Sequence, residues 1–136
     1  MHPEDLAKLH AFCFTTPRPW RADEFADLLK SRGTFLISHT NGFALGRIAG
    51  PEAELLTIAV HPEAQNAGHG ARLVDDFLCN ATTLGAKDIF LEVAENNPSA
   101  IALYLKLGFK QVAKRKEYFK QINGPALTAL IFKYSI

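Results

Sequence analysis

Cysteine, tryptophan and long apolar runs are all scarce in this chain of 136 residues. Its two cysteines, Cys13 and Cys79, are too few for a disulfide framework. Neither stands in a Cys-x-x-Cys or Cys/His ligand spacing, and the five histidines form no metal-binding pair, so we expect no metal site. No apolar run approaches the roughly 18 residues that span a bilayer, and a signal peptide is not evident. We therefore expect a cytoplasmic protein with no membrane partner.

A strong charge of one sign is also lacking. Fifteen Lys and Arg residues oppose 14 Asp and Glu residues, which leaves a formal net charge of +1. A net charge this close to zero argues against a protein that binds DNA non-specifically through its charge, so we expect no direct DNA binding. Hydrophobic residues make up 48% of the chain and charged residues 21%, an ordinary globular composition. The length predicts a single domain over residues 1–136.

Glycine and proline mark the ends of the expected elements. Apolar residues at helical spacing predict helices over residues 3–14, about 22–32, about 68–84 and about 99–107. Apolar and β-branched runs predict strands over residues 34–38, 43–48, 54–60, 88–94, 109–115 and 127–134. Thr16-Pro17-Arg18-Pro19 is expected to end the first helix, and Ile122-Asn123-Gly124-Pro125 to join the last two strands.

The middle of the chain reads strand, helix, strand over residues 54–94. This order is a βαβ unit, which requires two parallel strands and a right-handed crossover. Hairpin chemistry before and after it predicts antiparallel strands on either side. The sequence therefore predicts an α/β (α+β) fold, a mixed sheet with helices on both faces.

The segment from Val60 to Ala71 has the form of an anion-binding turn, in which a strand enters a glycine-containing loop that opens a helix. Gly68 and Gly70 lack a Cβ, so a ligand can approach the backbone closely. The segment is not a P-loop, because Ala71-Arg72 follows where Lys-Ser/Thr is needed. A packing turn without a ligand remains the alternative.

Two blocks of the sequence resemble the GCN5-related N-acetyltransferase (GNAT) family. Gln65-x-x-Gly68-x-Gly70, after a strand ending Val60-x-Pro62, is similar to the acetyl-CoA signature of that family. The downstream block resembles most closely the RimI-like, ribosomal-protein-alanine N-acetyltransferase branch; it comprises Leu91-Glu92-Val93, Asn97-x-x-Ala100-x-x-Leu103-Tyr104 and Leu107-Gly108-Phe109. Weaker similarity lies at Pro19-Trp20, Phe25, Arg115 and Tyr118. The resemblance spans about residues 5–135.

The resemblance implies the GNAT fold, with a mostly antiparallel sheet of about six to seven strands, a central parallel pair and helices on both faces. It implies an enzyme that transfers the acetyl group of acetyl-CoA directly to a primary amine, without a metal. Backbone groups are expected to pair with pantetheine at Ile58, Ala59 and Val60. The residues expected to wrap the pyrophosphate are Gln65, Asn66, Ala67, Gly68, His69, Gly70 and Ala71. Asn97 is expected to contact the cofactor near its thioester.

By the same resemblance, Glu92 is the general base and Tyr104 the general acid. A free α-amine has a pKa of about 8 and must lose a proton before it attacks. A carboxylate near the carboxyl end of a strand can take that proton directly or through one water. A phenol can protonate the departing thiolate. A solvated strand carboxylate and a core tyrosine are the plain alternatives for these two residues.

The acceptor that we expect is the α-amine of a protein or peptide N-terminus. A lysine side chain or a small-molecule amine stays open, as does a non-catalytic CoA-binding module on the same fold. Two positions depart from the family pattern: Asn66-Ala67 stands where many relatives carry Arg, and Thr128 where the ribosomal branch has Asp. We expect a monomer or a weak homodimer.

Other reactive or charged side chains receive plainer interpretations. Cys13 and Cys79 are expected to be buried, inert thiols, and His61 and His69 to be solvated loop residues. A group of basic residues is expected to form a solvated face, with contact to an acidic or nucleic-acid-bearing partner as the alternative; it consists of Lys110, Lys114, Arg115, Lys116 and Lys120.

Overall fold

The computed structural model describes residues 1–14, 18–121 and 124–136 of the chain. Its helices are α1 (Pro3–Cys13), α2 (Ala22–Lys30), α3 (His69–Thr83) and α4 (Pro98–Lys106), with a 3-10 turn at Pro62–Ala64. Its strands are β1 (Thr34–His39), β2 (Gly42–Ala49), β3 (Glu52–Val60), β4 (Asp88–Ala94), β5 (Lys110–Phe119) and β6 (Leu127–Ser135). All the expected helices and strands are present. The expectations for Thr16-Pro17 and Ile122-Asn123 lie outside the described residues.

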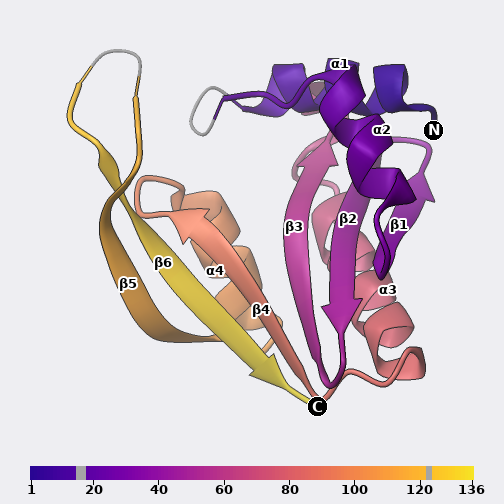
Figure 1. Ribbon diagram of the computed structural model, residues 1–136. Coiled ribbons are helices and arrows are strands. Elements are labelled where there is room, and N and C mark those ends of the chain that lie inside the picture. The colour runs from indigo at the N-terminus through magenta and orange to yellow at the C-terminus, as the bar shows by residue number, and fades with distance from the viewer. Residues whose placement is uncertain (15–17, 122–123) are drawn as a thin grey trace.

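The strands form one six-stranded sheet in the order β1-β2-β3-β4-β6-β5 (Figure 1). Strands β3 and β4 are parallel and are joined by α3, whereas every other neighbouring pair is antiparallel. The predicted βαβ unit and the mixed, mostly antiparallel sheet are therefore confirmed.

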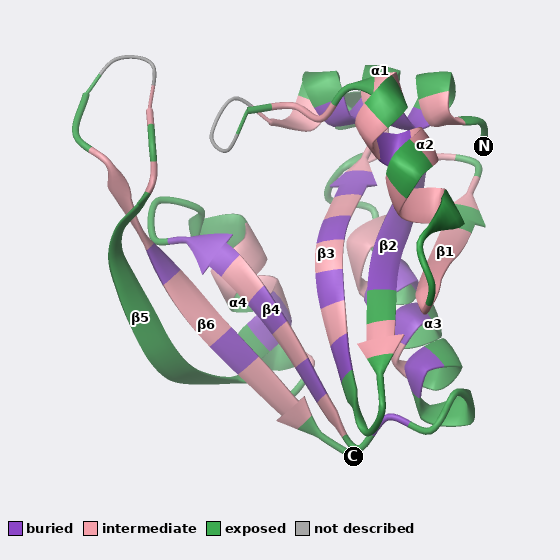
Figure 2. Cartoon of the chain, in the orientation of Figure 1, coloured by how far each residue is buried: buried purple, intermediate pink, exposed green. Residues whose placement is uncertain are grey.

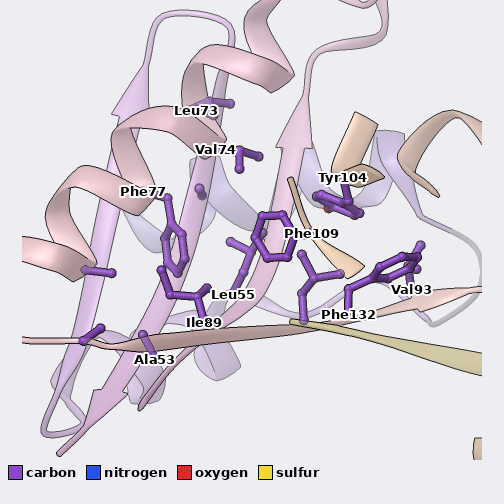
Figure 3. Close-up of a cluster of buried hydrophobic side chains, with 14 residues drawn as sticks. Ala53, Leu55, Leu73, Val74, Phe77, Ile89, Val93, Tyr104, Phe109 and Phe132 are labelled. Atoms are coloured by element: carbon purple, nitrogen blue, oxygen red, sulfur yellow. The ribbon is translucent and has the colours of Figure 1, made fainter. Parts of the chain in front are cut away.

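Helices cover both faces of the sheet, and each face has its own buried cluster (Figure 2). On one face α3 buries its apolar stripe, with Leu73 and Phe77 fully covered (Figure 3). A Cβ on Gly46 of β2 would lie 2.2 Å from the Phe77 ring, so only glycine allows α3 to pack this closely. On the other face α1 and α2 bury Leu6 and Phe25 against β2.

Strands β3 and β4 pair only at their beginnings and then diverge, as Figure 1 shows. Pairing ends at Leu55 opposite Leu91, although β3 continues to Val60 and β4 to Ala94. A β-bulge accompanies the divergence: Gly46 of β2 pairs with Leu55 and the preceding Leu45 pairs with Thr57, so Leu56 has no partner of its own. An extra residue of this kind bends the strand and increases its twist. The bulge therefore explains why the sheet splits at this point.

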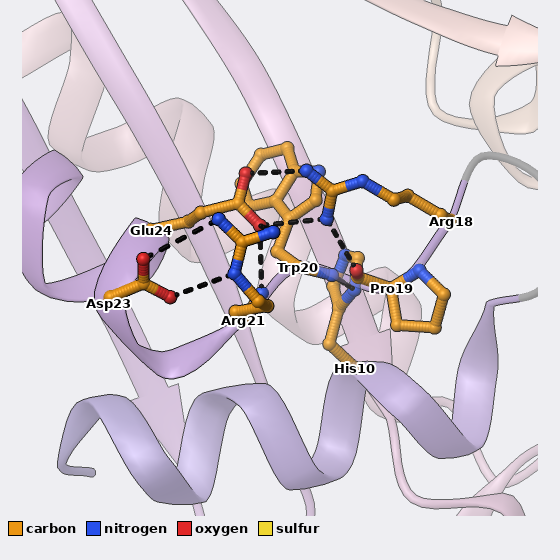
Figure 4. Close-up of polar contacts among 7 residues, drawn as sticks. All are labelled: His10, Arg18, Pro19, Trp20, Arg21, Asp23 and Glu24. Atoms are coloured by element: carbon orange, nitrogen blue, oxygen red, sulfur yellow. Dashed lines mark hydrogen bonds and ion pairs between the residues drawn. The ribbon is translucent and has the colours of Figure 1, made fainter.

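The side chain of His10 connects α1 to Thr57 of β3 beside the bulge, and it also contacts the backbone of Trp20 (Figure 4). The ring is 1% exposed, and its Nδ1 accepts the Trp20 backbone N–H at 3.0 Å. The proton of the neutral ring therefore sits on Nε2, which donates to Thr57 Oγ1 at 2.9 Å. Burial lowers the pKa of His10 to about 4, although nearby Glu24 opposes part of this shift. His10 is thus a neutral structural residue.

Candidate active site

The loop before α3 has the geometry of an anion-binding site. Gly68 (φ 84°) and Asn66 (φ 64°) both adopt the left-handed conformation, and a Cβ on Gly68 would meet nothing within 4 Å. The first backbone hydrogen bond at this helix end runs from Arg72 N–H to the Gly68 carbonyl at 3.1 Å. The amides of His69, Gly70 and Ala71 precede it and have no helical acceptor. Together with the positive end of the helix dipole, these amides suit a phosphate group.

Gln65 holds this loop against the end of β3. Its side-chain Nε2 donates to the Val60 carbonyl at 3.1 Å, and its backbone N–H donates to the Pro62 carbonyl at 3.5 Å. The Cys13 thiol donates to the same Val60 oxygen at 3.2 Å. Both donor groups of Gln65 are therefore engaged within the chain. The free amides begin one residue later, at Asn66.

Beyond the bulge, β3 turns the backbone groups of Ile58 and the N–H of Val60 toward the split, whereas the Val60 carbonyl already accepts Gln65 and Cys13. His61 N–H donates to the Asn41 carbonyl at 2.7 Å, which places the backbone groups of His61 on the β2 side. Backbone groups alternate sides along a strand, so Ala59 also faces β2, where it pairs with Phe43. Ile58 and Val60 then face the side from which β4 has diverged. Of the three expected pantetheine contacts, these two have the required orientation.

Glu92 lies at the point where the two strands part. It directly follows Leu91, the last β4 residue to pair with β3. Leu91 and Val93 are buried in the cluster under α3 and α4, so the intervening Glu92 points to the opposite face. Its carboxylate is 26% exposed, and its Oε1 lies 3.6 Å from Arg115 Nη1.

The carboxylate of Glu92 lines a pocket of about 500 Å³ on this face of the sheet. Arg115 and Tyr118 of β5 line the same pocket, as does a second ion pair, Arg47 with Glu54, whose closest atoms are 3.7 Å apart. The pocket therefore presents both positive and negative groups beside the expected base.

Tyr104 lies on the other face of the sheet, within the cluster of Figure 3. It is 5% exposed, and its ring centroid is 5.7 Å from that of Phe109 and 6.3 Å from that of Phe132. Burial raises the pKa of Tyr104 well above its ordinary value, so the phenol keeps its proton at neutral pH. The structure thus places the expected acid and the expected base on opposite faces of β4.

Asn97 caps α4 directly after β4. Its side-chain Oδ1 accepts the Ala100 backbone N–H at 3.2 Å, which explains the three-residue spacing of these two residues in the motif. The capping bond occupies the amide oxygen and leaves the NH₂ group available to a ligand. His61 also acts as a cap, because its Nδ1 accepts the Glu63 N–H at 3.2 Å.

The expectation for Cys79 was wrong, because this thiol is exposed on α3. The buried stripe of α3 consists of Leu73, Val74, Phe77 and Ala81, and residue 79 lies outside it on the helix. Cys13 is partly buried, and burial raises the pKa of its thiol.

The sequence also predicted that Arg115 belongs to a solvated basic face and gave no indication of its contact with Glu92. No sequence signal indicated that contact.

The described residues, 1–14, 18–121 and 124–136, contain neither a metal-binding group nor a membrane-spanning helix. Within these ranges, no three His, Cys, Asp or Glu side chains are grouped so that they could hold a metal ion. In the same ranges, every helix is too short or too polar to cross a membrane.

Comparison with known proteins agrees with this geometry. The model of the acetyltransferase (GNAT) family matches residues 4–109. The [ribosomal protein bS18]-alanine N-acetyltransferase of Escherichia coli K12 is 32% identical over 121 residues, which cover 86% of this chain and 78% of the relative. The crystal structure of the ribosomal-protein-S18-alanine N-acetyltransferase from Escherichia coli superimposes with a TM-score of 0.81 at 28% identity, covering 98% of this chain and 84% of that one.

A more distant structure, Arabidopsis thaliana NAA60 in complex with acetyl-CoA, shares the fold with a TM-score of 0.82 at 17% identity. That match covers 98% of this chain and 93% of NAA60. The family model matches well over half of the chain, and the loop, the split sheet and the helix end fit an acetyl-CoA molecule. This chain belongs to the acetyltransferase (GNAT) family, and it transfers the acetyl group of acetyl-CoA to an amine.

Proposed function

We propose that this enzyme acetylates the α-amine of a protein or peptide N-terminus, with Glu92 as general base and Tyr104 as general acid. The observation that carries the proposal is their position on opposite faces of β4. In a direct transfer, the amine adds to the thioester carbonyl carbon, and the thiolate is then expelled from the tetrahedral intermediate, so the base and the proton donor act at two different atoms. A base on the first face and a proton donor on the second match this requirement.

In this proposal acetyl-CoA binds from the α3 face. The amides from Asn66 to Ala71 hold its pyrophosphate, and the backbone of Ile58 and the Val60 N–H pair with the pantetheine amides as a strand pairs with an added edge. The thioester then lies in the split between β3 and β4, and the Asn97 NH₂ group is available to it. Cofactor capture rests on backbone groups and therefore does not need the Arg that Asn66-Ala67 replaces.

The reaction consumes one ammonium group and releases two protons from it. Glu92 takes the first proton, directly or through one water, and the amine nitrogen attacks the thioester carbonyl carbon. A carbon–nitrogen bond forms, and the carbon–sulfur bond breaks after the second amine proton has left to solvent. The Tyr104 phenol, which is protonated at neutral pH, passes its proton to the departing thiolate as the sulfur takes up negative charge. Solvent then restores the Tyr104 proton.

Two observations favour an N-terminal acceptor. The Escherichia coli relative, 78% of which this chain covers, is named an alanine N-acetyltransferase of ribosomal protein bS18, and a Mycobacterium tuberculosis relative is named an N-alpha-acetyltransferase. A carboxylate also lies beside Thr128, which stands where the ribosomal branch has Asp. Glu95 Oε1 accepts the Thr128 N–H at 3.3 Å, and the Thr128 carbonyl accepts the Glu95 N–H at 3.0 Å. Glu95 therefore supplies the negative charge that Thr128 lacks.

An acceptor screen tests the proposal. Peptides with a free N-terminal alanine, N-acetylated peptides with one lysine, and simple alkyl amines are each incubated with acetyl-CoA. The products are followed by mass spectrometry, because the exposed Cys79 would react with thiol reagents. We expect the highest kcat/KM for the alanine peptide. A preference for lysine or for small amines would contradict the proposed acceptor, and no transfer to any amine would favour a non-catalytic binding module.

A further inference from the structure

Arg115 is the residue that faces Glu92 across the pocket on the acceptor side of the sheet. Its Nη1 lies 3.6 Å from Glu92 Oε1, and its guanidinium carbon lies 5.1 Å from the centroid of the Tyr118 ring. A cation at this distance from an aromatic face is attracted to it. Arg115 is therefore held by two partners, one of which is the expected base.

An irregularity in β5 brings Arg115 and Tyr118 to the same face. Arg115 pairs with Ala129 and Phe119 pairs with Leu127, so the stretch of β5 between these pairs is longer than the matching stretch of β6. Within this stretch Glu117 adopts φ 53°, in the left-handed region. Residues 115 and 118 would point to opposite faces of a regular strand. The bulged backbone turns both toward the pocket, whereas Lys114 pairs with Leu130 on the α4 side.

The spacing of the two charges matches one class of amine. In an N-terminal residue or a free amino acid, the amine nitrogen and the adjacent carbonyl oxygen are separated by three bonds and lie about 3 Å apart. Glu92 and Arg115 present a negative and a positive group 3.6 Å apart. A lysine ε-amine carries four methylenes and offers no oxygen at this distance from its nitrogen.

We propose that Arg115 determines acceptor specificity by binding the carbonyl oxygen next to the acceptor amine. The inference rests on the proposed function, because it takes Glu92 as the partner of the amine. The Arg115 side chain is 55% exposed, so its ion pair with Glu92 is weak and the incoming ammonium can take its place. Stacking on Tyr118 then keeps the guanidinium beside the substrate, where it donates to the carbonyl oxygen.

The test compares Arg115→Met, Arg115→Lys and a matched control, Lys114→Met, which removes an exposed positive charge one residue away. Each variant is assayed with an alanine peptide, an N-acetylated lysine peptide, free alanine and propylamine. We expect Arg115→Met to raise KM for the alanine peptide at least tenfold, with less than a twofold change for the lysine peptide and propylamine. KM for acetyl-CoA should not change, Arg115→Lys should recover part of the loss, and Lys114→Met should resemble the wild type.

The assay with free alanine distinguishes a peptide N-terminus from a free amino acid, the two kinds of acceptor that carry a carbonyl oxygen next to the amine. A larger loss for free alanine than for the peptide supports the contact and assigns a free amino acid as the acceptor. An equal loss with propylamine would overturn the proposal, because Arg115 would then act through Glu92 alone. An unchanged KM in Arg115→Met, or the same loss in Lys114→Met, would overturn it as well.

A binding measurement distinguishes failure of this inference from failure of the proposed function. Calorimetric titration of the alanine peptide into CoA-saturated enzyme requires no turnover. We expect at least fivefold weaker binding to Arg115→Met than to the wild type, and equal binding of the lysine peptide. A wild type that binds the alanine peptide but does not acetylate it would contradict the proposed function alone. Equal affinity of the wild type and Arg115→Met for the alanine peptide would overturn the Arg115 contact.

Discussion

His10 of α1 donates a hydrogen bond to Thr57 of β3, and this buried contact is compatible only with a neutral imidazole ring whose Nδ1 accepts the Trp20 N–H. The contact joins a helix on one face of the sheet to the strand that carries the bulge. The protonation of one side chain is therefore coupled to the packing that supports the split between β3 and β4.

The first prediction concerns stability against pH. The pKa of His10 is about 4 in the folded chain and about 6.5 in the unfolded chain, so the unfolded chain binds more protons between these values. The contribution of the neutral His10 ring to the free energy of unfolding is therefore complete above pH 6.5. This contribution is lost as the pH falls toward 4, by up to about 3 kcal/mol in total. Urea unfolding between pH 5 and 8 measures the slope. His10→Gln should be less stable at pH 8 and should lose the slope; an unchanged slope would contradict this assignment.

The second prediction concerns the proposed base. Glu92→Gln keeps the shape of the side chain but removes its ability to take a proton, so kcat should fall by about 10²- to 10⁴-fold. KM for acetyl-CoA should stay within twofold, because Glu92 lies on the face opposite α3. Asp75→Asn makes the same chemical change on the exposed side of α3 and should leave turnover unaltered. Wild-type turnover in Glu92→Gln would exclude the role.

The third prediction concerns the proposed acid. Tyr104→Phe removes the phenol but retains the ring that packs on Phe109, so kcat should fall at least tenfold while the melting temperature changes little. Tyr134→Phe is the matched control, because that ring also contacts Phe109, at 5.4 Å between centroids. Steady-state kinetics and thermal unfolding separate the two effects. Equal kcat in the two variants would argue that Tyr104 is only a core aromatic.

The fourth prediction concerns the phosphate loop. Gly68→Ala forces a side chain into φ 84°, which costs about 1–2 kcal/mol and disturbs the loop amides. Acetyl-CoA should raise the melting temperature of the wild type, since only the folded chain binds it, and should raise that of Gly68→Ala by much less. Gly50→Ala carries similar strain at φ 57° in the turn between β2 and β3 and should keep the full acetyl-CoA response. A full response in Gly68→Ala would remove this loop from the cofactor site.

The elements of the fold could be predicted because their residues follow simple spacing. Leu73, Val74, Phe77 and Ala81 repeat at helical intervals, and Gly85 follows the C-terminal end of α3. The bulge at Leu56 and the irregularity between Arg115 and Phe119 could not be predicted in this way. Leu56 lies in an unbroken apolar run, and Glu117 takes a positive φ without being glycine. Both distortions arise from pairing with neighbouring strands, which local sequence does not encode.

The same limit applies to the candidate site. The resemblance to the family motifs implies roles for Glu92, Gly68 and Tyr104, and β4 puts Glu92 on the face expected from alternation. Arg115 appears in the sequence as one of several basic residues, and only the pairing of β5 with β6 brings it to Glu92. The contact of Gln65 with the pyrophosphate stays a prediction, and the structure adds that its side chain bonds to Val60 and its backbone N–H to Pro62.

The short pairing between β3 and β4 has a mechanical consequence. Four residue pairs join these strands, against eight between β2 and β3 and seven between β4 and β6. The sheet therefore behaves as two three-stranded ribbons that share one narrow seam. A cofactor paired with the free backbone beyond that seam would extend it and stiffen the whole molecule. Each release of CoA would loosen it again, so the rigidity of this enzyme should rise and fall once per turnover.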